Sequence, residues 1–178
     1  TKLYPACHQA HAFFIAARKI ASQHKINVDD IDSVLTRVTE PAVPLICEPA
    51  ALKRAPDSSY AAQFSLPYGI ACCLTRNRFG LEEIEEKSYT DPALLKLAAK
   101  VGYEIDPNSG FPKFRSGEVI VRMKNGEHFR QRESILPDEP AAESEIVEKF
   151  MLNVQPLMDR ARAETLRDTV LSLEQLPD

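Results

Sequence analysis

A β-hairpin is predicted by the stretch VIVRMKNGEHFRQRE, residues 119–133. Its first half is Val119-Ile120-Val121-Arg122-Met123-Lys124, which begins with three apolar residues. The Asn125-Gly126 pair follows, and it favours the positive φ angles of a tight turn. Charges of both signs alternate around this hairpin as Arg115, Glu118, Arg122, Lys124, Glu127, Arg130, Arg132 and Glu133. The stretch therefore predicts two antiparallel strands whose outer faces are solvated.

Helical segments are predicted on both sides of the hairpin. They comprise a helix over residues 6–24 entered through Pro5, a helix capped by Ser65, a helix over 92–101, and helices from Ala142 onward. A separate strand is predicted over residues 33–39, followed by a proline-bearing connection over 41–56. Separate helices and a hairpin, without regular βαβ alternation, favour the α+β class. We expect a small mixed domain, with a hairpin-containing antiparallel sheet packed by helices.

The composition restricts the class of protein. With 178 residues, 44% hydrophobic, and a net charge of −4, the chain is long enough for one sizeable core and has no broad basic surface for nucleic acid. Its four cysteines form no CxxC pair, which favours reduced thiols. No apolar run approaches the roughly 20 residues of a membrane span, and no signal-peptide pattern occurs. We expect a cytoplasmic protein without nucleic-acid or membrane partners.

The opening segment, residues 2–11, carries the strongest chemical signal. Lys2 lies just ahead of a predicted helix whose first turn contains Cys7 and His8. The positive end of a helix favours anions and disfavours a charged imidazole, so this combination suits carboxylate ligands and a neutral histidine base. His8 and His11 share one helix face.

Simpler interpretations of the same residues stay open. His8 and His11 could be partly buried polar residues at a domain boundary. A metal site is disfavoured because a helical histidine pair lacks its remaining ligands, and Cys7 has no identifiable base for acyl transfer. Tyr68 could donate a proton at a second helix start, or only pack there. The acidic run Glu82–Glu86, like His24 and His128, is predicted to be solvated.

Several short motifs follow one another along the chain. They are Lys2-Leu3-Tyr4-Pro5-Ala6-Cys7-His8 with His11, Ala61-Ala62-Gln63-Phe64-Ser65-Leu66-Pro67-Tyr68, Asp91-Pro92, the Asn125-Gly126 hairpin and Glu148-Lys149-Phe150. Together they resemble the MmgE/PrpD family over nearly all of the sequence. That family includes 2-methylcitrate dehydratase, cis-aconitate decarboxylase and iminodisuccinate epimerase, which act on small polycarboxylates without a metal or organic cofactor.

The resemblance implies a domain of a larger enzyme. In the family a large helical domain packs against a smaller α+β domain, with the active site between them. Residues 1–140 would be the smaller domain, and residues 141–178 a helical segment that packs on the helical domain. The expected partners are therefore that N-terminal helical domain, a second copy in a homodimer, and a di- or tricarboxylate substrate. An apolar patch should remain exposed on the first helix and on the C-terminal stripe that includes Phe150 and Leu157.

The resemblance also implies site residues and a reaction. Lys2 would bind a substrate carboxylate or stabilise developing charge, Tyr68 would donate or orient, and His11 and Ser65 would contact substrate. Some relatives have histidine where this chain has Cys7, so the acid/base role belongs either to Cys7 or to His8. The expected reaction is proton abstraction and return next to a carboxylate, in a dehydratase or other lyase. The alternatives are an epimerase and a non-catalytic carboxylate-binding module, and the isolated chain should be inactive.

Overall fold

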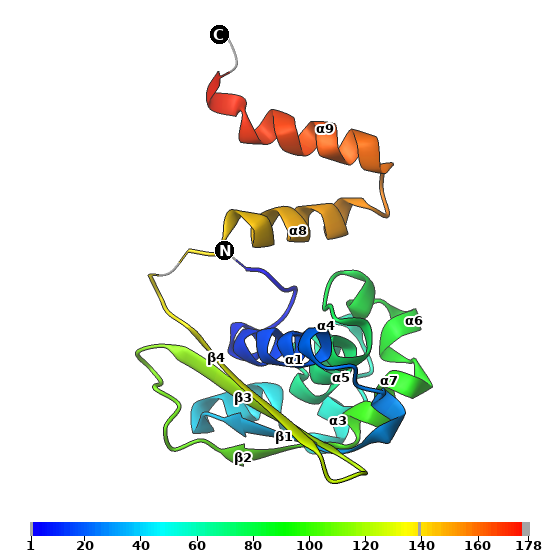
Figure 1. Ribbon diagram of the computed structural model, residues 1–178, viewed down its shortest axis with the longest axis vertical. Helices are drawn as coiled ribbons and strands as arrows, with labels where there is room; N and C mark the ends of the chain where they lie inside the picture. The colour runs from blue at the N-terminus through cyan, green and yellow to red at the C-terminus, as the bar shows by residue number, and fades with distance from the viewer. Residues whose placement is uncertain (1, 139, 176–178) are drawn as a thin grey trace. The chain divides into compact units, whose positions relative to one another are not determined.

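The computed structural model describes residues 2–138 and 140–175, which divide into two compact units (Figure 1). The α+β unit holds residues 5–138. The helical unit holds residues 2–4 and 140–175. Within the described residues, no helix is both long enough and apolar enough to span a bilayer.

A four-stranded mixed sheet forms the centre of the α+β unit. The strands are β1 (Ile31–Val38), β2 (Val101–Ile105), β3 (Arg115–Met123) and β4 (His128–Ile135). Their order is β2-β1-β3-β4, in which β1 and β2 run parallel and the other neighbours run antiparallel. With helices packed against this sheet, the predicted α+β class is confirmed.

The helices of the α+β unit are mostly short. They are a 3-10 turn (His8–Ala10) continuing into α1 (His11–Gln23), η2 (Val28–Asp30), η3 (Glu40–Ala42), α2 (Val43–Ile46), α3 (Ala50–Arg54), α4 (Ser59–Gln63), α5 (Leu66–Arg76), η4 (Glu82–Ile84), α6 (Glu86–Tyr89) and α7 (Pro92–Ala98). The stretch predicted as a connection over 41–56 therefore contains two helices. The predicted cap of α5 is confirmed, because the Ser65 hydroxyl accepts a hydrogen bond from Tyr68 N at 3.0 Å.

Helix α1 is wedged between the sheet and α5. It contacts β3 and β4 on one side and α5 on the other. A Cβ added to Gly117 of β3 would lie 2.7 Å from Cγ of Phe13, and one added to Gly69 of α5 would lie 2.2 Å from Cζ of Phe14. Two glycines thus make room for two phenylalanines, and the prediction of an exposed patch on this helix is wrong.

The predicted hairpin is confirmed, with one difference at its turn. Strand β4 pairs with β3 from Arg122 opposite His128 to Arg115 opposite Ile135. Only Gly126 takes a positive φ, of 90°, whereas Asn125 does not. The Asn125 side chain instead accepts a hydrogen bond from Glu127 N at 3.0 Å, which stabilises the turn locally.

Two glutamates predicted to be solvated are buried. Glu83 is 1% exposed, and its carboxylate accepts hydrogen bonds from Arg78 Nε at 2.9 Å and from Gly80 N at 2.8 Å. Glu118 of β3 is also 1% exposed and accepts from Arg130 Nε at 2.7 Å. Arginine side chains lie over both carboxylates and shield them from solvent. Alternating charges in the sequence do not reveal this shielding.

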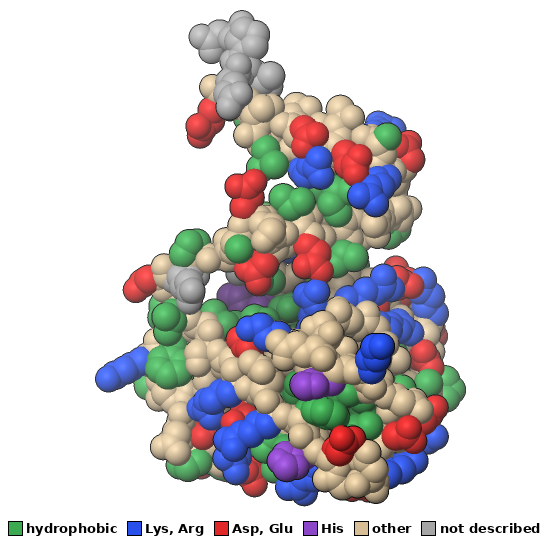
Figure 2. Space-filling view, in the orientation of Figure 1, with side chains coloured by type: hydrophobic (Ala, Val, Ile, Leu, Met, Phe, Trp, Pro, Cys, Tyr) green, Lys and Arg blue, Asp and Glu red, His purple; other side chains and the backbone are tan. Residues whose placement is uncertain are grey.

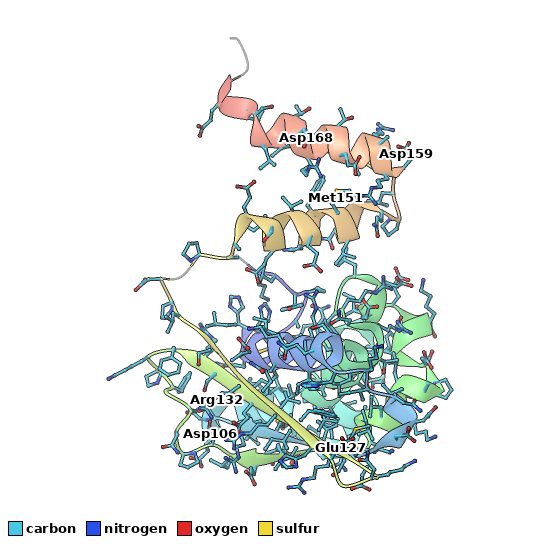
Figure 3. The ribbon with its side chains drawn as sticks, viewed as in Figure 1. Asp106, Glu127, Arg132, Met151, Asp159 and Asp168 are labelled. Atoms are coloured by element: carbon cyan, nitrogen blue, oxygen red, sulfur yellow. The ribbon has the colours of Figure 1, made fainter. Side chains whose placement is uncertain are left out.

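Many other charges of the α+β unit do lie at its surface. Figure 2 shows Lys and Arg side chains (blue) interspersed with Asp and Glu (red) over this unit. His24 and His128 are exposed, as predicted. Arg132 of β4 donates to the Asp106 carboxylate at 2.8 Å and joins the end of the hairpin to the residue after β2 (Figure 3). The mixture of signs leaves no extended basic face in this view.

The helical unit consists of α8 (Glu143–Val154), α9 (Arg160–Leu171) and η5 (Leu173–Gln175). Asp159 caps α9 by accepting from Arg162 N at 2.9 Å (Figure 3). Among the described residues, α8 has none that is buried, and α9 has only Ala163. The exposed apolar side chains are Ile146, Leu157, Leu166, Val170, Leu171 and Leu173. Of the predicted C-terminal apolar stripe, Leu157 is exposed as predicted, whereas Phe150 is half-buried.

Replacing Gly117 with alanine tests the close packing of α1 against β3. The new methyl group would collide with Phe13, including its backbone nitrogen at 2.8 Å, so α1 must move. We expect Gly117→Ala to lower the free energy of unfolding by about 1–3 kcal/mol in urea denaturation. Gly102→Ala is the matched control, because no atom lies within 4 Å of its added Cβ, and it should change stability by less than about 1 kcal/mol. If the two changes lowered the free energy of unfolding equally, the close packing of Phe13 against Gly117 would be contradicted.

Candidate functional site

The Cys7–His11 turn, residues 7–11, leads into α1. Cys7 has an extended backbone, with φ −56° and ψ 131°, and precedes the first helical residue, His8. Its N–H donates to the Gln63 carbonyl at 2.9 Å, and its carbonyl accepts from Ala10 N at 2.9 Å. The helix therefore begins at His8, not at Ala6 as predicted. The hydrogen bond to Gln63 holds Cys7 outside the helix, which the sequence could not show.

His8 and His11 lie against each other on this turn. Their ring centroids are 4.6 Å apart and the ring planes meet at 78°, an edge-on contact. His8 is exposed, whereas His11 is only 2% exposed. His11 Nε2 lies 3.4 Å from the Ala6 carbonyl. Because a carbonyl only accepts, Nε2 carries the proton in that contact, and the two rings occupy one face as predicted.

This arrangement suits proton exchange with a ligand. The His8 ring reaches solvent and is backed by His11, whose own position is fixed by the Ala6 carbonyl. The half-buried Cys7 thiol is next to His8 in the sequence. Because the start of a helix favours negative charge, a carboxylate is the ligand chemistry that this turn suits best.

Tyr68 and Ser65 are buried at the start of α5. Tyr68 is 0% exposed, and its hydroxyl donates to the Glu83 carbonyl at 2.6 Å. Burial raises the pKa of Tyr68 well above its usual range. The Ser65 hydroxyl caps α5 and donates to the Lys53 carbonyl. A direct chemical role for either hydroxyl requires that it leave these partners.

Lys2 belongs to the helical unit, where it is exposed and where its backbone carbonyl accepts a hydrogen bond from Lys149 Nζ. The structure thus brings Cys7, His8 and His11 together on one turn. Through the hydrogen bond from Cys7 to Gln63, it places that turn beside the chain that leads to Ser65. The described residues contain no group of three or more His, Cys, Asp or Glu side chains arranged to hold a metal ion.

Lys53 of α3 was missed by the sequence interpretation. Although it is a lysine in a polar segment, it is only 9% exposed, and its ammonium donates to the Leu45 carbonyl at 2.7 Å. Burial lowers the pKa of Lys53, while the sulfurs of Cys47 and Cys7 act to raise it. Residues 41–56 show no periodic pattern that would predict the burial of Lys53.

The cysteines differ in accessibility. Cys47, Cys72 and Cys73 are buried, and burial raises the pKa of Cys47 and of Cys72 to about 12 and that of Cys73 well above its usual range. Cys7 is only half-buried. The thiolate is the reactive form, so the buried thiols should be inert at neutral pH.

Thiol labelling tests this difference. With iodoacetamide at pH 7.5, read by mass spectrometry, we expect one thiol per native chain to react, at Cys7, and all four after denaturation. The Cys7→Ser variant should stay unlabelled in its native state. Rapid native labelling of Cys47 or Cys72 would contradict the packing described for α2 and α5.

A family model described as the MmgE/PrpD C-terminal domain matches residues 4–175. No curated protein matches the chain. The match covers the Cys7–His11 turn, the whole sheet and both C-terminal helices.

Proposed function

Because this chain belongs to the MmgE/PrpD family, matching its C-terminal domain, we propose that it is part of an enzyme that moves a proton next to a carboxylate. The proposed substrates are small di- and tricarboxylates. The family match over residues 4–175 carries the proposal. The exposed His8 ring at a helix start supports it, because that position combines a proton acceptor with a preference for anions.

His8 is the proposed acid and base. In its neutral form it takes a proton from the carbon next to a carboxylate, which leaves an enolate-like anion. The anion then expels a leaving group in a dehydration or other lyase reaction, or regains a proton in an epimerisation. The Cys7 thiol is the alternative acid, because on the family pattern some relatives have a histidine at its position. The proposal requires no metal or organic cofactor.

Lys2, His11 and Ser65 are the proposed substrate-binding residues, and Tyr68 the proposed donor, on the family pattern. Lys2 would provide a fixed positive charge for a carboxylate or for the developing enolate. The contact between the His11 and His8 rings supports the proposed role of His11. The buried hydroxyls of Ser65 and Tyr68 give these two residues a structural task in the α+β unit as well.

In the complete protein, another domain is proposed to pack against the helical unit. Its exposed side chains Leu166, Val170 and Leu171 have the apolar character of a buried helix face. On the family pattern, an N-terminal helical domain packs there, and the complete protein forms a homodimer. The residues needed for turnover are then shared between domains, so the isolated chain should be inactive.

Substitution of Lys2 in the complete natural protein tests the proposal. We expect Lys2→Met to lower kcat/KM by about 100-fold or more in turnover assays on di- and tricarboxylates, because a charge that stabilises the transition state is lost. Lys25→Met is the matched control. Lys25 is also exposed, lies beyond the end of α1 and should be dispensable.

The outcomes separate the alternatives. If Lys2→Met keeps full turnover while calorimetry shows weaker carboxylate binding, the residue only captures ligand. Native-level turnover by residues 1–178 alone would contradict the shared active site. Absence of turnover by the complete protein on every di- and tricarboxylate tested would contradict the enzyme proposal itself.

A further inference from the structure

Arg115, at the start of β3, is a half-buried arginine whose side chain has no partner among the described residues. It makes no hydrogen bond or ion pair there, and its Nε is buried without an acceptor. A buried donor without an acceptor costs free energy, so the position of Arg115 requires an explanation. The other half-buried arginines of the described chain all have partners, which are Asn77 for Arg18, Glu104 and Glu118 for Arg37, Glu83 and Asp91 for Arg76, Glu82 and Glu83 for Arg78, and Asp168 for Arg167.

The strand places Arg115 close to the start of α1. Arg115 lies on the same face of β3 as Gly117, because side chains two residues apart in a strand point the same way. A Cβ added to Gly117 would lie 2.8 Å from Phe13 N, so this face of β3 meets the first turn of α1. Two residues of strand span about 7 Å. An arginine side chain can cover that distance to a ligand beside the turn.

The far end of α1 shows in which direction the helix crosses β3. His24, which follows α1, stacks on Phe129 with ring centroids 4.3 Å apart. Phe129 lies opposite Val121 in the hairpin. The helix therefore runs along β3 from Gly117 toward Val121, and both elements begin at the same end of the α+β unit (Figure 1). Because Arg115 precedes Gly117, it lies at the end where α1 begins.

We propose that Arg115 is a substrate-binding residue, whose guanidinium takes one carboxylate of a di- or tricarboxylate held at the Cys7–His11 turn. The inference rests on the proposed function and deepens it, since an acid with several negative charges needs more than one cationic contact. Two parallel N–H donors of a guanidinium match the two oxygens of a carboxylate. A carboxylate bound in this way supplies the acceptor that Arg115 lacks among the described residues.

Calorimetry of tricarballylate binding to the complete protein tests this role. This tricarboxylate has no hydroxyl group to eliminate, so its binding is measured without dehydration. We expect Arg115→Met to raise the Kd by about tenfold or more, because a hydrogen-bonded ion pair with the ligand is lost. Arg122→Met is the matched control. Arg122 is an exposed residue of the same strand that points to the opposite face, so its loss should change the Kd by less than about twofold.

An unchanged Kd in Arg115→Met would overturn the proposal. Equal weakening by Arg122→Met would overturn it too, since the effect would then come from overall charge, and so would a failure of the unaltered complete protein to bind tricarballylate. Arg115→Lys keeps the charge without the paired donors, and its Kd should lie between those of the unaltered protein and Arg115→Met. If Arg115→Met does not fold, Arg115→Gln replaces it, and an unchanged Kd would again overturn the proposal.

A second measurement separates this inference from the proposed function. In the complete protein, Arg115→Met should raise KM more than it lowers kcat, because Arg115 holds the substrate away from the reacting carbon. If tricarballylate binding depends on Arg115 but no acid is turned over, the carboxylate site stands and the enzyme proposal fails. If acids are turned over and Arg115→Met changes neither the Kd nor KM, the enzyme proposal stands and the inference about Arg115 fails.

Discussion

The close approach of α1 to β3 and α5 is the constraint on which the α+β unit depends. Phe13 lies against Gly117, and Phe14 against Gly69, at distances that leave no room for a Cβ on either glycine. Phe14 also packs on Phe79, with ring centroids 4.8 Å apart. This packing fixes the direction of α1 and therefore the place of the Cys7–His11 turn that begins it. The chemistry proposed for His8 relies on a rigid support of this kind.

The buried charges of this unit differ in how they are compensated. The carboxylates of Glu83 and Glu118 are each matched by arginine, so that their desolvation is offset locally. Glu83 also supports Tyr68 through its backbone carbonyl. Lys53 is only 9% exposed, and among the described residues it has no ion pair with a carboxylate; its ammonium donates to the Leu45 carbonyl at 2.7 Å.

Local signals in the sequence were sufficient to predict much of the fold. The hairpin and the α5 cap follow from Asn125-Gly126 and Ser65, because turns and caps are formed by neighbouring residues. The start of the first helix was misplaced, because a hydrogen bond from Cys7 to the distant Gln63 decides it. The burial of Glu83 was missed for the same reason: arginine cover is a tertiary property.

The candidate site was predictable only in part. The shared face of His8 and His11 follows from their spacing, and the contact of their rings confirms it. The hydroxyl of Tyr68 was predicted to serve chemistry, and its bond to Glu83 is visible only in the folded chain. Lys53 carried no signal, because nothing in a proline-bearing stretch of short helices indicates which lysine is buried.

Proton exchange at carbon tests the central claim most directly. The complete protein would be incubated in D2O with a panel of di- and tricarboxylates, and each acid followed by NMR. We predict that at least one acid gains deuterium at the carbon next to a carboxylate, and that His8→Ala together with Cys7→Ala abolishes this gain in a folded protein. Absence of deuterium from every acid of the panel, or full exchange in the double variant, would contradict the account.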